Sequence, residues 1–300
     1  MTTKLKNWWI FTKERFDPSS HLVMIVVFLF AHLLVINPIK SIRSNSLQDL
    51  LLFIAITLFY FKLRLYDEVK DYELDVVINK SRPLPRGLLN HNDMYRGMIF
   101  CIFIELLCFS FMGLNALICL SIAILYSLLM YKEFFIKTLI RPHLTTYALM
   151  HTIVTSILSF AIFSFLSKES FLSLISSKPL ISFSILNWLL FNIFEFGRKT
   201  FAKTEERDQV DTYSSLFGRT GAVLLVVSQA FFAHYLSFNL SGANKTSLLW
   251  MSVILFGLLS LISLFYITKD SPKAAKLYRN FSSAYIILFY LIIIITHIIP

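Results

Sequence analysis

Nine long apolar runs follow one another along this chain of 300 residues. Each is close to the roughly 20 residues that an α-helix needs to cross a bilayer. The runs are continuously apolar instead of alternating, which favours helices over strands. We therefore predict an all-α, polytopic membrane helix bundle with about nine transmembrane helices in a single domain over residues 1–300. The predicted spans are residues 21–37, 47–65, 95–113, 114–131, 144–166, 180–197, 220–237, 247–267 and 281–299.

The composition agrees with a membrane protein, because 56% of the residues are hydrophobic and only 15% are charged. The formal net charge of +10 would suit a nucleic-acid-binding protein if the cations were spread over one surface. The cations instead gather in the segments that connect the predicted spans on one side of the membrane. With the N-terminus inside, all but five of the 28 Lys and Arg residues lie on the inner side. The five outer cations are Lys40, Arg43, Lys168, Lys178 and Lys245.

This asymmetry predicts the orientation, since cytoplasmic loops carry the excess of Lys and Arg. The N-terminus and two long charged loops, residues 66–94 and 198–219, are expected in the cytoplasm, as in a protein of a bacterial inner membrane. The basic excess is then a topology signal. We expect the lipid bilayer, and no nucleic acid, as a partner.

The first charged loop begins with a regular series of carboxylates in "DEVKDYELD". Asp67, Asp71 and Asp75 are four residues apart, which places them on one face of a helix. Like charges at this spacing repel each other, and a bound cation between them would relieve the repulsion. Carboxylate oxygens suit Mg²⁺, which typically uses one or two carboxylates and the phosphates of a substrate. Glu68 is a further candidate ligand.

The same loop continues with cations in the rigid segment "NKSRPLPRG". Pro83 and Pro85 favour an extended path that holds the neighbouring side chains in place. Arg82 and Arg86 match phosphate oxygens with two hydrogen bonds each, and Lys80 adds a compact charge. Carboxylates for a metal followed by cations for phosphate favour a diphosphate site. The alternative is a solvated cap whose cations touch lipid headgroups.

These residues resemble the first aspartate-rich motif of the UbiA superfamily of intramembrane prenyltransferases, N-D-x-x-D-x-x-x-D followed by K-x-x-R-P. Asp67 stands at the Asn position, Glu68 at the next Asp, and Asp71 and Asp75 at the remaining two. Lys80, Arg82 and Pro83 match the closing element as K-x-R-P, with one residue fewer between the Lys and the Arg.

A second stretch, "LYSLLMYKEFF", is similar to the family's segment at the end of the fourth span, through Tyr126 and Lys132. The resemblance implies an all-helical fold and a Mg²⁺-dependent transfer of a prenyl group. The donor would be an isoprenyl diphosphate, and the acceptor an aromatic or other lipophilic molecule.

The family's second aspartate-rich motif is altered in this chain, where the corresponding stretch reads "NIFEFGRKTFAKTEERD". Asn192 and Glu195 fit an N-x-x-D pattern with Glu for Asp, but Lys199 stands where another Asp is expected. Three interpretations remain open. Lys199 replaces a metal ion beside the diphosphate, or the site binds without catalysis, or Lys199 pairs with Glu195 and caps the helix.

Aromatic and histidine side chains near the motifs are candidates for the acceptor or carbocation site. Tyr66 and Tyr126 could stabilise a carbocation through their ring faces. His143, Tyr147 and His151 share one face of the fifth span and could orient or deprotonate an acceptor. Hydrogen bonding between helices is the alternative.

Together, the residues and the resemblance predict a prenyltransferase with Asp67, Asp71 and Lys199 as its catalytic residues. The alternatives are a terpene cyclase on the same scaffold and a non-catalytic protein that binds or transports isoprenoids. A transporter is disfavoured because the charges lie at the ends of the spans, not at the bilayer midplane. The predicted metal ligands are Asp67, Glu68, Asp71, Asp75 and Glu195. The predicted diphosphate contacts are Lys80, Arg82, Arg86, Arg198 and Lys199.

Overall fold

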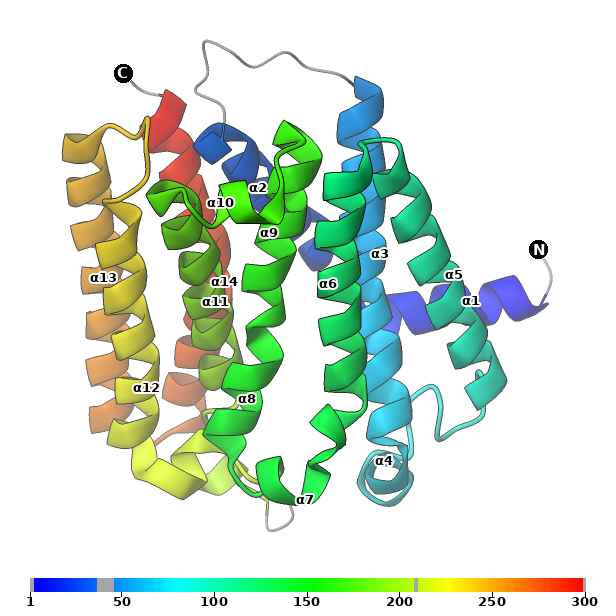
Figure 1. The fold of residues 1–300 in the computed structure, drawn as a ribbon. Coiled ribbons are helices and arrows are strands. Elements are labelled where there is room, and N and C mark those ends of the chain that lie inside the picture. Colours follow the sequence, from blue (N-terminus) through cyan, green and yellow to red (C-terminus); the bar gives the residue numbers. More distant parts are fainter. Residues whose placement is uncertain (1–2, 37–45, 208–209, 299–300) are drawn as a thin grey trace.

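The computed structural model describes residues 3–36, 46–207 and 210–298, and within these ranges it consists of helices and connections without strands (Figure 1). Helix α1 lies across the direction of the long helices, and several short helices lie at one end of the bundle. The elements are α1 (Thr3–Arg15), α2 (Pro18–Ile36), α3 (Ser46–Lys70), α4 (Tyr72–Ile78), α5 (His91–Ser110), α6 (Leu114–Tyr131), η2 (Glu133–Phe135), α7 (Lys137–Ile140), α8 (Leu144–Thr152), α9 (Val154–Ser167), α10 (Phe171–Leu174), α11 (Lys178–Arg198), η3 (Lys203–Glu205), α12 (Tyr213–Ser237), α13 (Lys245–Thr268) and α14 (Pro272–Ile298).

Each of the nine predicted spans corresponds to a helix or, for residues 144–166, to the consecutive helices α8 and α9. Eight of these segments are long and apolar enough to cross a membrane. The prediction of nine differs at α5, which falls outside the eight because it carries Asp93, Arg96 and Glu105. The chain is a multi-pass membrane protein. Residues 37 and 299 of the predicted spans, together with Lys40 and Arg43, lie outside the described ranges.

A buried ion pair connects α5 to α3. The Lys62 ammonium lies 2.5 Å from a Glu105 carboxylate oxygen, and neither side chain is exposed. The same ammonium lies 4.3 Å from the ring centroid of Phe59. A charge inside a membrane protein is costly unless a partner neutralises it. The position of α5 therefore depends on the complementary charge of α3.

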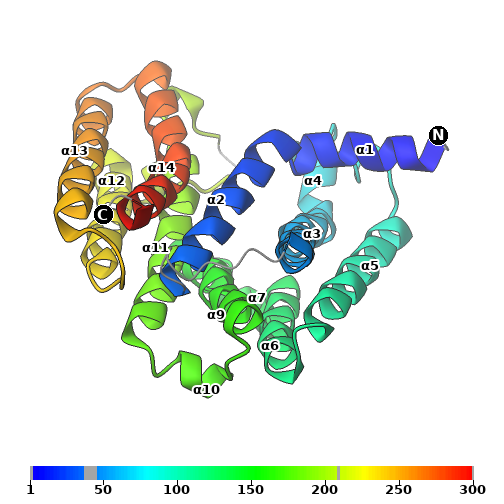
Figure 2. The ribbon, with the colours of Figure 1, turned by 90° about the horizontal axis from the view of Figure 1, so that it is seen from above.

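The two halves of the bundle are visible from above, where α3, α5 and α6 lie on one side and α11 to α14 on the other (Figure 2). Helices α2 and α9 lie between them. The Asn187 amide of α11 donates to Ser159 of α9 at 2.7 Å, and Tyr290 of α14 donates to the Asn187 carbonyl at 2.9 Å. Such interhelical hydrogen bonds matter because burial against lipid gives helices little reason to associate.

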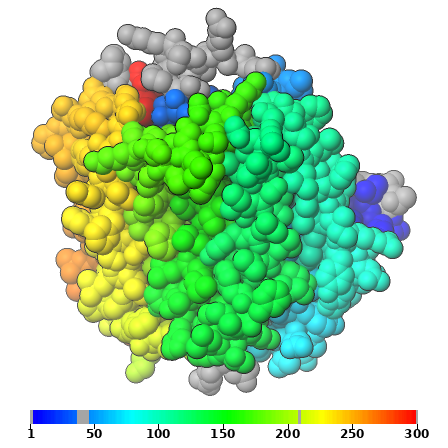
Figure 3. All heavy atoms as spheres, viewed as in Figure 1, coloured from blue at the N-terminus to red at the C-terminus, as the bar shows by residue number. Residues whose placement is uncertain are grey.

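Side chains fill the space that the ribbon leaves between α6 and α9, which pack directly against each other (Figure 3). Helices α4 and α7 lie together at the lower end in Figure 1. We call this end of the bundle, with α4, α7 and residues 199–207 and 210–212 of the connection between α11 and α12, the motif end.

The connection between α11 and α12 is held to α14 by one arginine. The Arg279 guanidinium donates to both carboxylate oxygens of Glu205 at 2.9 Å, and to the Thr200 carbonyl at 3.1 Å. The hydrogen bonds from Arg279 lower the pKa of Glu205 below its usual value, while burial opposes the shift. The ionised carboxylate thus binds this arginine more strongly than the protonated acid does.

This pair predicts a pH-dependent contribution to stability. Because the pKa of Glu205 is lower in the folded chain, the contribution is complete above the ordinary Glu pKa of about 4.3 and is lost as the pH falls through the folded-state value. We expect Glu205→Gln to unfold at a lower temperature than the wild type at pH 7 and to lose this difference in acid. Thermal unfolding in detergent measures it. Glu73→Gln, at an exposed position, is the control, and an equal difference at both pH values would contradict the prediction.

Candidate active site

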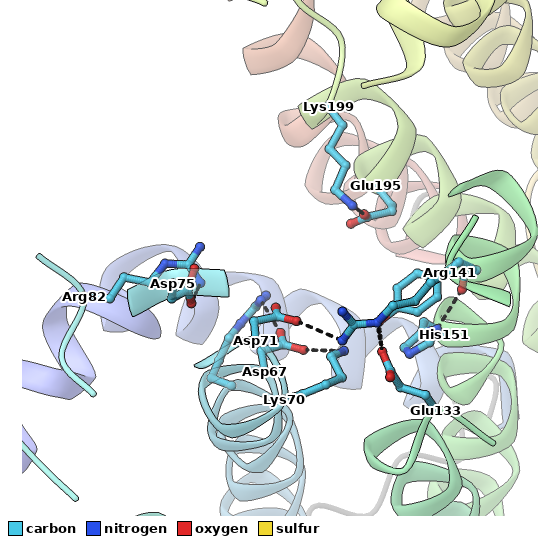
Figure 4. A network of polar contacts seen from close by, with 12 residues as sticks. Asp67, Lys70, Asp71, Asp75, Arg82, Glu133, Arg141, His151, Glu195 and Lys199 are labelled. Atoms are coloured by element: carbon cyan, nitrogen blue, oxygen red, sulfur yellow. Dashed lines mark hydrogen bonds and ion pairs between the residues drawn. The ribbon is translucent and has the colours of Figure 1, made fainter. Parts of the chain in front are cut away.

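Two carboxylates lie where α3 ends. The helix stops at Lys70, and the chain bends at Asp71 before α4 begins. The side chains of Asp67 and Asp71 are 35% and 36% exposed, so both are accessible to a ligand. Asp75 is buried, and the bend carries it away from the other two (Figure 4). The common face expected from the spacing therefore ends at Asp71, because the helix axis changes direction there.

Cations surround this carboxylate pair. One Asp67 oxygen lies 3.3 Å from the Lys70 ammonium, and the other lies 3.4 Å from Arg64. Asp71 lies 3.8 Å from Nη2 of Arg141, which comes from the connection between α7 and α8. This Nη2 is buried and makes no hydrogen bond within the described part of the chain. It is a donor that a bound anion would satisfy.

Arg141 is held by a second, buried carboxylate. Its Nε donates to Glu133 at 2.6 Å, and the Tyr147 hydroxyl reaches the same oxygen at 3.5 Å. Glu133 lies in η2, where it and the next two residues have positive φ angles of 49°, 54° and 58°. Side chains rarely tolerate this backbone region, and such strain is often found at functional sites. Neither Glu133 nor Arg141 was predicted, although Glu133 follows directly on the family-like Lys132.

A fourth carboxylate, Glu195, projects from α11 toward the same region (Figure 4). Glu195 accepts from Arg198 Nε at 2.6 Å and lies 2.9 Å from the Lys199 ammonium. Arg64 of α3 is close enough to Glu195 and Arg198 for their charges to interact. Helices α3 and α11 thus face each other with their charged ends. The ion pair of Lys199 with Glu195, one of the three interpretations of the altered motif, is present, and Lys199 is the C-cap residue of α11.

Several predicted ligands have other partners. Glu68 is 1% exposed and forms an ion pair with Arg15 of α1. Arg82 pairs with Asp75, which also accepts from Asn79 at 2.8 Å. The pair of Arg82 and Asp75 lies to one side of Asp67 and Asp71 (Figure 4).

Two further residues that were predicted to contact the diphosphate, Lys80 and Arg86, do not lie beside Asp67 and Asp71. Arg86 lies 2.8 Å from Glu14 of α1, and Lys80 is exposed. In this structure the "RPLPRG" segment packs toward α1, and its Arg82 pairs with Asp75. The cations beside Asp67 and Asp71 are Arg64, Lys70 and Arg141.

The histidine and the tyrosine of α8 lie beside the charged cluster. The rings of Tyr147 and His151 stack with centroids 3.9 Å apart. Nδ1 of His151 lies 2.7 Å from the Tyr147 carbonyl oxygen, which only accepts. Nδ1 therefore carries the ring proton, and Nε2 has a free lone pair. That Nε2 is buried without a hydrogen-bond partner among the described residues.

The remaining predicted residues are either exposed or in contact with neighbouring helices. His143 precedes α8 as its N-cap residue and is exposed, so the expected three-residue stripe is reduced to Tyr147 and His151. The Tyr126 hydroxyl donates to the Met150 carbonyl at 2.7 Å and links α6 to α8. Tyr66 is buried against Tyr131, with ring centroids 5.0 Å apart. Asn192 donates to Gln229 of α12 at 3.1 Å.

The electrostatics favour a bound cation at Asp71. Burial raises the pKa of the Asp71 carboxyl, and the charges of Asp67 and Asp75 raise it further, while Lys70 and Arg141 oppose the shift. A divalent cation would stabilise the ionised form. Within the described residues no three His, Cys, Asp or Glu side chains form a cage for a metal ion. The carboxylates of Asp67 and Asp71 nevertheless fit Mg²⁺, which takes one or two protein carboxylates and completes its shell with phosphate oxygens and water.

The comparisons with known proteins find similarity in the fold. No protein-family model and no curated protein matches the sequence. A UbiA homologue from Aeropyrum pernix K1 is 15% identical, with a TM-score of 0.64 over 92% of this chain and 97% of that one. The structure of a digeranylgeranylglyceryl phosphate synthase in membranes is 18% identical, with a TM-score of 0.62 over 98% and 99%. This chain has the UbiA fold. The similarity spans the whole bundle and includes the motif end.

We expect the ion pair of Asp75 and Arg82 to contribute to the free energy of unfolding in the absence of any ligand. Removing one partner of a buried ion pair costs about 3 kcal/mol, since the other charge stays unpaired. We expect Asp75→Asn and Arg82→Gln each to lower the free energy of unfolding by this amount, and the double substitution to cost little more than either. Chemical unfolding in detergent measures it, with Lys80→Gln as the control. Additive effects would contradict this pairing.

Proposed function

We propose that this UbiA-fold chain is an intramembrane prenyltransferase that uses Mg²⁺ to move a prenyl group from an isoprenyl diphosphate to a lipophilic acceptor. The observation that carries the proposal is the accessible carboxylate pair of Asp67 and Asp71, surrounded by cations and opposed by Glu195 across the bundle. Carboxylates with cations at the end of a membrane bundle suit a ligand with a polyanionic head and a long apolar tail.

The diphosphate would bind through the cations that the cluster already gathers. Arg141 offers its unpartnered Nη2, and Arg64 and Lys70 hold Asp67 through contacts longer than 3.2 Å. Such long contacts are weak and can be exchanged for shorter bonds to phosphate oxygens. Arg198 and Lys199 would close the site from α11, where Glu195 holds both side chains in place.

Asp67 and Asp71 would hold Mg²⁺ against the diphosphate, with Glu195 available from the opposite helix. Bound there, Mg²⁺ would neutralise negative charge that develops on the leaving diphosphate. Lys199 would add a fixed positive charge where the family motif has a further Asp. This assignment keeps the interpretation that Lys199 replaces a metal ion, and its ion pair with Glu195 orients it.

The reaction divides into two bond changes. The carbon–oxygen bond of the donor breaks, and its electron pair leaves with the diphosphate. An electron pair of the acceptor then forms the new bond to the allylic carbocation, and the acceptor loses a proton. His151 Nε2 has the free lone pair to take this proton. The surrounding bundle keeps water away from the carbocation, and Tyr147 beside His151 presents an aromatic ring to it.

The orientation follows from the Lys and Arg asymmetry. We place the N-terminus and the motif end at the cytoplasmic face, as expected for a bacterial inner-membrane protein. A soluble isoprenyl diphosphate would then reach the cations from the cytoplasm while its tail enters the membrane.

The first test is diphosphate release by the purified protein supplied with geranyl, farnesyl and geranylgeranyl diphosphates. We expect release from at least one donor, dependent on Mg²⁺, and a loss of at least about 100-fold in Asp71→Asn, because a ligand of the Mg²⁺ that would neutralise the leaving diphosphate is removed. The matched control is Asp49→Asn, an exposed Asp in the first turn of the same helix, far from the motif end.

The outcomes distinguish the candidate functions. No release from any donor by a protein that still binds lipid diphosphates would contradict catalysis and leave a binding protein. Release with a cyclised hydrocarbon product and no acceptor would indicate a terpene cyclase. Release that is unchanged in Asp71→Asn would remove Asp71 from the site.

Substitution of His151 should change which product forms without changing the ionisation of the donor. His151→Phe keeps a ring against Tyr147 but removes the base, and a general base contributes about 100-fold or more. We expect the prenylated acceptor to fall by about this factor, while captured water yields prenyl alcohol instead. Chromatography of products from geranylgeranyl diphosphate with a phenolic acceptor or a lipid alcohol measures the ratio. His143→Phe is the control, and an unchanged ratio in His151→Phe would exclude the base role.

A further inference from the structure

A groove of about 410 Å³ lies between α1, α3 and α5 and shares no residue with the charged cluster. Its walls combine aromatic and aliphatic side chains with a few charged ones. Among the residues that line it are Lys4, Trp8, Leu58, Phe61, Arg96 and Phe100.

The body of the groove is apolar and lies on the outer flank of the bundle. Phe100 is 59% exposed, and its neighbours Ile99 and Phe103 on α5 are 68% and 61% exposed, which identifies this flank as one that faces lipid. Gly97 allows α1 to approach α5, because a Cβ at Gly97 would lie 2.8 Å from the Trp8 indole. An apolar groove on such a flank is filled by hydrocarbon in a membrane.

The mouth of the groove is basic. The Lys4 ammonium lies 2.6 Å from Asp93, and Arg96 is exposed one turn further along α5. Asp93 already accepts from the Asn90 backbone N–H at 3.3 Å, so its charge is engaged in capping α5. Lys4 and Arg96 therefore carry two positive charges at the mouth against the single negative charge of Asp93. Helix α1 as a whole carries Lys4, Lys6, Lys13 and Arg15 but only one acid, Glu14, which pairs with Arg86.

The position of α1 places the basic mouth of the groove next to its apolar body. The helix lies across the direction of the spans, beside the halves of α3 and α5 that are nearer the motif end (Figures 1 and 2). Its Lys4 contacts the first turn of α5, so the mouth lies at the end of this span. A helix in this orientation with basic and aromatic side chains is typical of the membrane interface, where Trp and Lys meet lipid headgroups.

We propose that this groove binds one anionic phospholipid. Its phosphate lies between Lys4 and Arg96, and one acyl chain lies against Trp8, Phe61 and Phe100. The basic mouth selects an anionic headgroup over a zwitterionic one. The bound lipid fills the space between α1 and α5 and holds α1 against the bundle.

The test uses Trp8 as a reporter. In a protein with Trp9→Phe, Trp188→Phe and Trp250→Phe, Trp8 is the remaining tryptophan. The protein is reconstituted in phosphatidylcholine vesicles that contain either brominated phosphatidylglycerol or the same fraction of brominated phosphatidylcholine. Bromine on an acyl chain quenches tryptophan emission on contact. We expect phosphatidylglycerol to quench Trp8 at about a five-fold lower fraction, as one net cation at an anionic lipid surface provides.

The variants assign the preference to the groove. Lys4→Gln with Arg96→Gln should abolish the preference for phosphatidylglycerol, while quenching by brominated phosphatidylcholine stays unchanged and shows that α1 is still in place. Lys6→Gln with Lys13→Gln removes as much charge from α1 outside the groove and should keep the preference. Equal quenching by both lipids in the parent protein would overturn the proposal. A preference that survives the first pair, or that the second pair abolishes equally, would also overturn it.

Discussion

Charged side chains in a membrane helix bundle lose much of their hydration, so each needs a counter-charge from a neighbouring segment. The motif end is organised by this requirement. Asp67 and Asp71 are balanced by Lys70 on the same helix and by Arg141 from a distant connection. Arg141 is in turn oriented by the buried Glu133. The cluster is close to neutral when empty, and its longer contacts can be exchanged for those of a ligand that brings both phosphate and a metal ion.

The same requirement places helices far from the cluster. Helix α5 carries Glu105 within its span, and Lys62 of α3 neutralises it. On the other side, Glu195 of α11 holds Arg198 and Lys199 at the helix end. The altered second motif therefore still presents an ordered pair of cations toward α3. In the proposed site Lys199 would take the place of a metal ion, and its ion pair with Glu195 fixes the position of its ammonium.

The similarity to UbiA-fold structures extends over the whole chain although few residues are shared. Lipid-facing positions accept almost any apolar residue, which explains how the sequences diverge while the helix packing persists. Inside the bundle the demands are stricter. Asn187 satisfies partners from α9 and α14 at once, and such a buried amide tolerates few replacements.

The sequence by itself determined the membrane class, the approximate spans and the pair of carboxylates at Asp67 and Asp71, because apolar length and helical spacing are local properties. The sequence did not determine which Lys and Arg side chains lie beside Asp67 and Asp71. Arg141 lies 70 positions beyond Asp71 in the chain, and its selection over Arg82 depends on the bend at Asp71 and on the packing of "RPLPRG" against α1. The free Nε2 of His151 likewise follows from one contact with the Tyr147 carbonyl. Tertiary structure decided these features, because partner choice among many Lys and Arg side chains depends on distances that helical periodicity does not encode.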